Sequence, residues 1–212
     1  MNLFDYRDDY KKEALLKSTL EATPQQQFQK WLREAISLSC DKANAMTLST
    51  VNPAGQPRGR IVLLKELNER GFVFFSNYES IKGLHINENP KASICFYWTE
   101  LERQVIVQGT LHKIPRQESI RYFNSRPIDS QISAAISAQS QKVTSRNELI
   151  QKANQLSNSL SIGEYPKCPE SWGGYALNPT LVEFWQGRPD RMHDRFEYNL
   201  QGATWNIDRL SP

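Results

Sequence analysis

The sequence lacks long hydrophobic runs and has few cysteines, and each absence narrows the class of protein. No stretch of its 212 residues approaches the roughly 18 apolar residues of a membrane-spanning helix. The first residues, MNLFDYRDDYKK, do not have the pattern of a signal peptide. The three cysteines, Cys40, Cys95 and Cys168, are odd in number and lack CxxC spacing, which argues against a disulfide framework and a zinc site. We therefore expect a soluble, cytoplasmic protein with no membrane partner.

Concentrated charge of one sign and the common catalytic signatures are also missing. Lys and Arg total 26 against 23 acidic residues, and a net charge of +3 is too mild for a nucleic-acid partner. The sequence has no glycine-rich nucleotide fingerprint, no GxSxG elbow and no HExxH motif. Its three histidines are far apart, so a histidine-rich metal site is not expected.

What the sequence does have is the composition of one folded domain. A hydrophobic content of 39% and an aromatic content of 10% are too high for a disordered chain. The length fits one domain rather than two. We expect residues 1–20 to form a mobile N-terminal arm, with a charged, weakly amphipathic helix over 5–17. Residues 21–212 are then the single domain.

Two capping boxes mark the clearest helices. Thr23, followed by Pro24 and Gln26, predicts a helix whose apolar residues recur through Ile36. Ser145 with Glu148 predicts another, and the whole stretch from 117 to 160 has a helical pattern. A short helix is expected over 80–87.

Runs typical of β-strands, separated by turn signals, fill most of the remaining chain. Because the connections between the first five are short, the order favours an antiparallel meander or barrel over βαβ units. We therefore expect an α+β fold, a β-barrel with helices outside it. The runs are 45–51, 60–67, 71–77, 91–98, 104–114, 174–187, 194–200 and 203–210.

Two groups of cations are placed as if to bind small anions. Arg60 and Lys65 stand at the two ends of one hydrophobic strand and point to opposite faces, although solvated strand ends would look the same. Arg126 directly precedes a proline, with Tyr122 and Ser130 nearby, and this donor set suits a phosphate at a helix boundary. A capped helix start, with an ion pair from Arg126 to a neighbouring aspartate, is the alternative.

The segment 182–195 is the most informative. If it is extended, Arg191 and His193 share a face and Arg195 continues that row. A cation beside a histidine lowers the pKa of the imidazole. Such a pair is a poor choice if the two residues serve packing alone. An exposed basic turn remains the alternative.

This segment resembles the signature of the pyridoxine/pyridoxamine 5′-phosphate oxidase family: Glu-Phe-Trp-Gln-Gly at 183–187, then Arg-Met-His-Asp-Arg at 191–195. The resemblance covers nearly the whole chain in the same order, through RIVLLK (60–65), LERQV (101–105), YFNSRPIDSQI (122–132), SWGG (171–174) and the terminal WNIDRLSP. It implies a homodimeric split β-barrel with FMN at the subunit interface. It also implies oxidation of pyridoxine or pyridoxamine 5′-phosphate to pyridoxal 5′-phosphate by O2, giving H2O2.

The resemblance also implies roles for individual residues. Arg191 would orient the substrate and favour the transition state, and His193 would position it; these two are the implied catalytic residues. Substrate would be bound by Lys65, Tyr122, Arg126 and Ser130 at its phosphate, by Arg191, Met192 and His193, and by Arg7 and Tyr10 as a lid. FMN would be bound by Arg60, Ile61, Val62, Leu63, Leu64, Lys65, Phe75, Ser76, Lys82, Gln104, Gln139, Ser140, Trp185 and Arg195.

Two positions depart from the family pattern. Ile81 stands where the family usually has arginine, and Phe75 where it usually has tyrosine, so FMN affinity is the property in question. The alternative functions are a non-catalytic FMN or pyridoxal phosphate carrier and a flavin reductase with another substrate. The intact phosphate set and the intact Arg191 and His193 argue against both.

Overall fold

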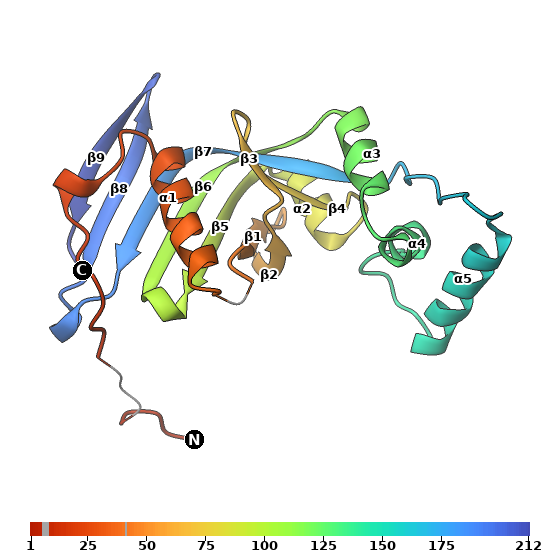
Figure 1. The fold of residues 1–212 in the computed structure, drawn as a ribbon, viewed down its shortest axis with the longest axis horizontal. Helices are drawn as coiled ribbons and strands as arrows, with labels where there is room; N and C mark the ends of the chain where they lie inside the picture. Colours follow the sequence, from red (N-terminus) through yellow and green to blue (C-terminus); the bar gives the residue numbers. More distant parts are fainter. Residues whose placement is uncertain (6–8, 41) are drawn as a thin grey trace.

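The computed structural model of the protein describes residues 1–5, 9–40 and 42–212. Over these residues it has five α-helices and nine strands, joined antiparallel in one sheet (Figure 1). The helices are α1 (Pro24–Ser37), α2 (Ile81–Glu88), α3 (Arg116–Asn124), α4 (Ile128–Ile136) and α5 (Arg146–Ser159). The strands are β1 (Ala45–Val51), β2 (Pro57–Leu63), β3 (Glu66–Asn68), β4 (Gly71–Asn77), β5 (Lys91–Trp98), β6 (Arg103–Lys113), β7 (Trp172–Gln186), β8 (Asp194–Gln201) and β9 (Thr204–Leu210).

Strand β7 divides the sheet into two parts. Its residues 172–177 pair with β4 and its residues 181–186 pair with β8, while β6 follows its other edge along both stretches. The β6–β7 pairing shifts register between Gln108 and Gly109, where β7 changes partner. As a result, β8 and β9 lie at one end of the molecule and α3, α4 and α5 at the other (Figure 1). The predicted antiparallel α+β fold is confirmed.

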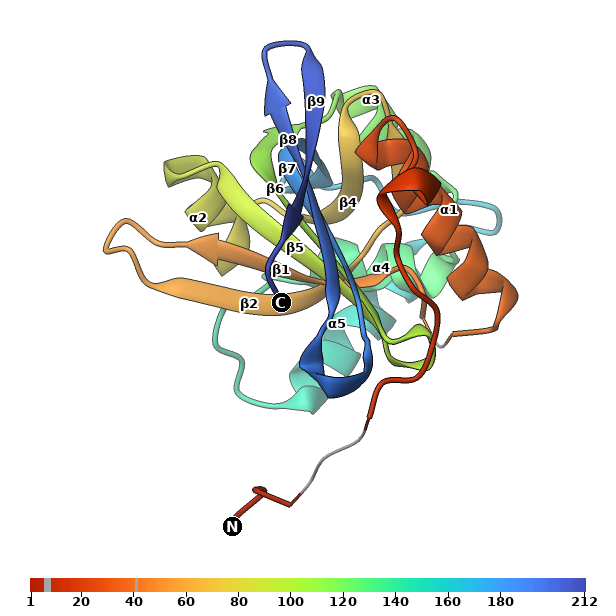
Figure 2. The same ribbon diagram turned by 90° about the vertical axis from the view of Figure 1, so that its left-hand side faces the viewer.

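Helix α1 lies against one side of the sheet (Figure 2), and its aromatic residues Phe28 and Trp31 are buried. Thr23 caps it, as the sequence predicts. Phe28 is fully buried, with its ring centroid 4.9 Å from that of Phe72 and 4.8 Å from that of Phe96. Burying one such side chain contributes about 1.5–3 kcal/mol, so packing rather than helix propensity holds α1 in place.

The run 60–67 forms two strands, where one was predicted. The N–H of Leu64 bonds a carbonyl just before β1, whereas the N–H of Lys65 bonds the carbonyl of Val73 in β4, each at 2.8 Å. The chain therefore changes partner strand between these two residues. The single-strand prediction was wrong because alternation of side chains does not reveal such a corner, and the corner is what places Lys65.

The helix predicted over 5–17 is absent from the described part of that segment. Residues 9–16 are irregular, and a short 3₁₀ turn follows at Lys17–Thr19. The N–H groups of Lys11 and Lys12 donate to the side chain of Glu102 and not to carbonyls of a helical turn. Tertiary contacts therefore override the weak helical pattern. Mobility of the arm, and the division at residue 20, stay predictions.

Three features of the described residues bear on the function classes considered above. None of their helices is long and apolar enough to cross a membrane. They contain no group of three or more His, Cys, Asp or Glu side chains suited to a metal ion. All three cysteines are free thiols.

Candidate functional site

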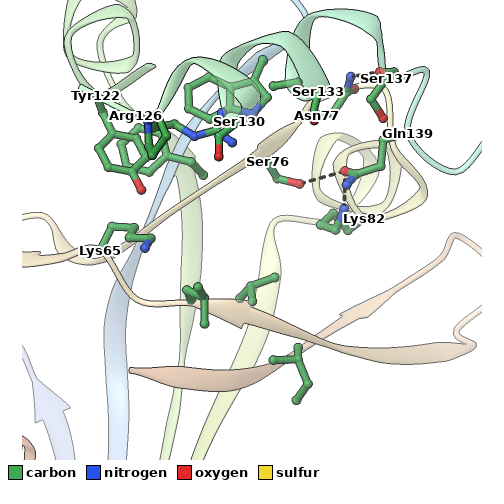
Figure 3. Close-up of a pocket in the computed structure, with 17 residues that line it drawn as sticks. Lys65, Ser76, Asn77, Lys82, Tyr122, Arg126, Ser130, Ser133, Ser137 and Gln139 are labelled. Carbon is green, nitrogen blue, oxygen red and sulfur yellow. Dashed lines mark hydrogen bonds between the residues drawn. The ribbon is translucent and has the colours of Figure 1, made fainter. Parts of the chain in front are cut away.

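A cavity of about 640 Å³ lies between β2, β4 and helix α4. Side chains from these elements and from the loop after α4 point into it (Figure 3). Polar groups gather at two places, around Arg126 and around Lys82. We call the cavity the cation pocket; it is lined by Ile61, Val62, Leu63, Lys65, Phe75, Ser76, Asn77, Lys82, Tyr122, Arg126, Pro127, Ser130, Ser133, Ala134, Ser137, Gln139 and Trp172.

Lys65, Tyr122, Arg126 and Ser130 meet on one side of the pocket (Figure 3). The corner after β2 supplies Lys65, and the link between α3 and α4 supplies Arg126. Burial lowers the pKa of Arg126, and its Nη1 is buried without a hydrogen-bond partner among the described residues. Among the described residues, Arg126 forms no ion pair. The alternative, a helix start with Arg126 paired to an aspartate, is therefore not observed. A guanidinium with one buried, unpaired nitrogen, beside a lysine, a phenol and a hydroxyl, suits a phosphate.

Flat aromatic rings form the wall beside these donors. The rings of Phe75 and Tyr122 are stacked at 4.0 Å, and Trp172 continues the stack at 5.4 Å from Phe75. The guanidinium carbon of Arg126 lies 5.0 Å from the centre of the Trp172 ring. The stack fixes the position of Arg126 through a cation–π contact and gives the pocket a planar apolar surface.

The other polar side is built around the start of α2. Lys82 Nζ donates to Gln139 Oε1 at 2.8 Å and to Ser80 Oγ at 3.0 Å, and Ser76 Oγ donates to the same glutamine oxygen at 3.2 Å. The N–H of Ile81 donates to Ser140 Oγ at 3.4 Å. Residues almost sixty positions apart in the sequence thus meet at one helix N-terminus, where the helix dipole favours an anion.

Arg60 adds a further cation to this side. Burial, together with the positive charges of Arg60 and Arg58, lowers the pKa of Lys82 to about 8. Arg60 Nη1 donates to Leu48 O at 3.0 Å and to Thr50 Oγ1 at 2.8 Å, whereas its Nη2 is buried without a partner among the described residues. Cations that crowd together and leave buried donors unpaired fit a phosphate group.

A second group of predicted residues lies at the far end of β7. The strand register sets Gln104 of β6 and Arg195 of β8 directly opposite Trp185 of β7, on one face of the sheet. The ring of His193 lies 4.7 Å from that of Trp185, and the ring of Tyr10 meets both edge-on at 5.4 and 5.5 Å. We call these five residues the aromatic cluster.

The turn before β8 departs from the extended conformation considered for 182–195. Residues Pro189–Arg191 form a 3₁₀ turn, and Asp190 and Arg191 have φ of 56° and 60°. Arg191 and His193 therefore do not alternate along a strand, and the shared-face argument was wrong at this point. Positive φ in two consecutive residues that are not glycine costs conformational energy, and such strain is found at functional sites.

His193 is held in one tautomer. Its Nδ1 accepts the N–H of Arg188 at 3.1 Å, so the proton of the neutral ring is on Nε2. Burial lowers the pKa of His193, and the charge of Arg191 lowers it further. The ring is thus a neutral hydrogen-bond donor through Nε2.

Arg195 is already paired. Its Nε and Nη2 donate to the two carboxylate oxygens of the buried Glu183 at 2.8 and 3.1 Å, and Nη1 donates to Ser211 O at 2.8 Å. This bidentate pair neutralises the guanidinium. Arg195 is therefore better suited to orient a neutral ring edge than to bind a phosphate.

The structure brings the predicted residues together in two places and not in one. Trp172 lines the cation pocket and Trp185 lies in the aromatic cluster, near opposite ends of a 15-residue strand that spans about 50 Å when extended. Leu64, predicted at the cofactor, is buried in the core, and Arg7 lies outside the described residues. The predicted residues that do not line the pocket are Tyr10, Arg60, Leu64, Gln104, Ser140, Trp185, Arg191, Met192, His193 and Arg195.

Sequence reasoning missed part of the pocket wall. Small residues recur along α4 at helical spacing, from Ser130 through Ser133 and Ala134 to Ser137, and this face lines the cavity. That periodicity is visible in the sequence and could have indicated a helix approached closely by a ligand. The lining residues not predicted are Asn77, Pro127, Ser133, Ala134, Ser137 and Trp172.

Comparison with known proteins identifies the family. Residues 29–159 match the family described as pyridoxamine 5′-phosphate oxidase, and residues 172–212 match the pyridoxine 5′-phosphate oxidase C-terminal dimerisation region. The chain belongs to the pyridoxine/pyridoxamine 5′-phosphate oxidase family. It is 46% identical to such an oxidase from Cyanothece sp., covering 100% of this chain and 99% of the relative, and 48% identical to one from Bordetella pertussis, covering all of both.

Solved structures place this oxidase-family chain among split-barrel proteins. PhzG from Burkholderia lata, in complex with tetrahydrophenazine-1-carboxylic acid, superposes with a TM-score of 0.89 at 25% identity, covering 95% of this chain and 99% of PhzG. An FMN-binding, pyridoxamine 5′-phosphate oxidase-related protein from Nostoc punctiforme shares the fold, with a TM-score of 0.72 at 17% identity over 92% and 99% of the two chains. The predicted split β-barrel with flanking helices is thereby confirmed.

Membership of an oxidase family makes the chain an oxidoreductase, and the family supports a flavin cofactor. The residues present fit such a group. The unpaired Nη2 of Arg60 and the amine of Lys82, which lies near other cations, suit the phosphate of a flavin nucleotide. On the sheet face that they share, Gln104 offers a hydrogen bond and Trp185 an aromatic surface. The dimerisation match spans β7, β8 and β9, which carry much of the aromatic cluster.

Proposed function

We propose that this protein oxidises pyridoxine 5′-phosphate and pyridoxamine 5′-phosphate to pyridoxal 5′-phosphate. With the alcohol, O2 takes two electrons and two protons to give H2O2; with the amine, water is also consumed and ammonia released. FMN supplies the redox chemistry when bound, and the protein binds and orients the reactants. The observation that carries the proposal is the presence of two phosphate-type donor groups in one pocket.

The donors around Arg126 would bind the substrate phosphate. Arg126 and Lys65 supply charge, and Tyr122 and Ser130 supply hydroxyl donors, so a phosphate can receive several charge-assisted hydrogen bonds. The flat stack of Phe75 and Tyr122 beside them matches a small aromatic ring.

The donors around Lys82 would bind the phosphate of FMN. Arg60, Lys82, Gln139 and Ser140 converge on the start of α2, and Ser76 lies beside Gln139. The strand segment 61–63 lines the space between the two donor groups, so its backbone would run beside the flavin ring.

Each active site would combine residues of two copies of the chain. The aromatic cluster cannot reach the cation pocket of its own chain, because β7 holds the two near its opposite ends. A homodimer that seats the cluster of one copy over the pocket of the other brings together all the residues that the family resemblance implies. A matched dimerisation region over 172–212 supports this arrangement.

Arg191 and His193 would then act on the substrate from the partner's side. His193, neutral and protonated on Nε2, would donate a hydrogen bond that positions the substrate. Arg191, held exposed at a strained turn, would orient the reacting carbon and stabilise charge that develops during oxidation.

The decisive experiment is a visible spectrum of the purified protein with FMN, recorded without oxygen before and after pyridoxamine 5′-phosphate is added. Loss of the oxidised flavin bands, with pyridoxal 5′-phosphate formed in equal amount, supports the proposal. Bands that persist would exclude turnover and favour a carrier. Reduction by a nicotinamide nucleotide alone would favour a flavin reductase.

A second candidate is oxidation of a substrate without phosphate. Its basis is the superposition with PhzG, which was solved with tetrahydrophenazine-1-carboxylic acid. Comparing pyridoxine with pyridoxine 5′-phosphate separates the two, because the unpaired Arg126 gives no advantage to a substrate that lacks the phosphate. Equal kcat/KM for both would favour the second candidate.

A further inference from the structure

The N-terminal arm is held to the body through its backbone. The N–H groups of Lys11 and Lys12 donate to the same carboxylate oxygen, Oε2 of Glu102, at 2.9 and 3.0 Å. Leu15 N donates to Asp194 Oδ2 at 3.1 Å. Hydrogen bonds to a carboxylate are about twice as strong as those between neutral groups. The carboxylates of Glu102 and Asp194 therefore attach the arm to the body just after Tyr10.

Glu102 occupies a backbone position that does not favour glutamate. It ends the short turn between β5 and β6 in the left-handed region, at φ 53° and ψ 41°. Glycine or asparagine adopts this conformation at lower cost. Its carbonyl also accepts the N–H of Gly187 at 2.8 Å, so the residue links the arm to the end of β7.

The contact surface for Tyr10 is shaped to receive the ring. A Cβ added at Gly187 would lie 2.6 Å from Tyr10 Cγ, closer than real contacts allow. Tyr10 meets Trp185 and His193 edge-on, and these two residues belong to the aromatic cluster. The glycine of the Glu-Phe-Trp-Gln-Gly segment thus leaves room for a side chain from the arm.

We infer that Glu102 is a positioning residue that clamps the arm and thereby holds Tyr10 against Trp185 and His193. It acts through Tyr10 and does not itself reach the reacting atoms. The clamp closes the active site at this edge, so its loss should weaken retention of substrate more than it slows the chemical step. The kinetic part of this inference rests on the proposed function, whereas the clamp itself does not.

Glu102 is a better test position than Asp194. Asp194 also pairs with Arg209 at 2.8 Å and with Arg188 at 3.6 Å, so changing it would disturb β8 and β9 as well as the arm. Glu102→Gly removes the carboxylate and relieves the left-handed strain, so the fold should be retained. Glu102→Gln keeps one acceptor oxygen. Glu100→Ala is the matched control, because Glu100 is an exposed glutamate of the same turn whose carboxylate bonds Thr99.

The first measurement is limited trypsin digestion of the intact protein with FMN, following cleavage after Lys11 and Lys12. Loss of two charge-assisted hydrogen bonds should speed this cleavage by about tenfold or more in Glu102→Gly, since cleavage follows the population of the released arm. Glu102→Gln should show a smaller increase, and Glu100→Ala none. An unchanged rate in Glu102→Gly would overturn the clamp. So would a lower thermal midpoint with faster cleavage along the whole chain, because that result indicates a structural role.

The second measurement is a double-mutant cycle with Tyr10→Ala. Glu102→Gly and Tyr10→Ala should each raise KM for pyridoxine 5′-phosphate several-fold, and the double variant should match Tyr10→Ala alone. Additive effects would overturn the claim that Glu102 acts through Tyr10. If the parent protein oxidises neither phosphorylated substrate, the proposed function fails, and the digestion still decides whether the clamp exists.

Discussion

The cation pocket and the aromatic cluster differ in how their positive charges are balanced. Arg126 in the pocket and Arg60 beside it each keep a buried guanidinium nitrogen without a partner among the described residues, and the pKa of Lys82 is lowered to about 8. Near the cluster, arginines form ion pairs: Arg195 with Glu183, and Arg103 with Glu34. Buried charges need partners. The pocket is therefore arranged for an anionic ligand, whereas the arginine pairs near the cluster hold the protein together.

Arg191 is the exception that tests this comparison most strongly. It lies near the cluster, yet it is exposed, has positive φ and forms no ion pair among the described residues. If it acts on the transition state, Arg191→Ala should lower kcat by about ten- to a thousand-fold, or roughly 1.4–4 kcal/mol. Steady-state kinetics at saturating FMN measure this. Arg33→Ala, which removes an exposed arginine of α1, is the control. A raised KM with unchanged kcat would contradict the assignment.

Arg126 should behave in the opposite way. Because it offers the substrate phosphate the same contacts before and during reaction, Arg126→Ala should raise KM about ten- to a hundred-fold and leave kcat near the parent value. The effect should vanish with pyridoxine that lacks the phosphate. Arg146→Ala, at the exposed start of α5, should leave both constants unchanged. A large loss of kcat in Arg126→Ala would remove the distinction between the two regions.

Local patterns were sufficient for most of the fold. Capping boxes and apolar periodicity located α1 and α5, and alternation located the strands, because these signals depend on near neighbours in the chain. The same reasoning wrongly predicted a helix in the arm, because N–H groups of the arm donate to carboxylates that are distant in sequence. The break at Lys65 depends on a change of partner strand, which alternation does not encode.

The candidate site was predictable by residue type more than by arrangement. Arg126 with its neighbouring donors could be recognised from spacing, and the family resemblance supplied distant residues such as Gln139. The sequence could not show that Gln139 joins Ser76 and Lys82, because that contact needs the loop after α4 to fold back onto α2. Nor could it show that Glu183 already neutralises Arg195, which requires the β7–β8 register.

Ile81 tests whether the pocket has room for one more cation. It stands at the first position of α2, beside Lys82, where the family resemblance implies an arginine. Ile81→Arg should lower the FMN dissociation constant by about tenfold, and by more at low salt, since a hydrogen bond to a charged group contributes about 1.5–3 kcal/mol. Quenching of flavin fluorescence measures the affinity. Asn87→Arg, which adds the same charge to an exposed position of α2, is the control. No change at low salt would show either that Ile81 does not face the phosphate or that Arg58, whose charge already acts on Lys82, takes this role.

Titration of Lys82 gives the smallest expected effect, a dependence of FMN affinity on pH. It tests whether the charge of Lys82 in the pocket lacks a partner. Its pKa of about 8 means that it is mostly charged below pH 8 and mostly neutral above it. The FMN phosphate, with a second pKa near 6, stays a dianion throughout this range. FMN affinity should therefore be highest below pH 8 and fall about tenfold between about pH 7 and pH 9, as the charged fraction of Lys82 drops from about nine-tenths to about one-tenth.

The matched variant for this titration is Lys82→Arg, because arginine stays protonated over the whole range. Its FMN affinity should be nearly independent of pH, whereas the parent affinity declines. Both dissociation constants come from fluorescence titrations at constant ionic strength. A parent profile as flat as that of Lys82→Arg would show that Lys82 keeps its charge without a ligand. Lys82 would then not contribute to the unbalanced charge that distinguishes the pocket from the paired arginines at the other end of β7.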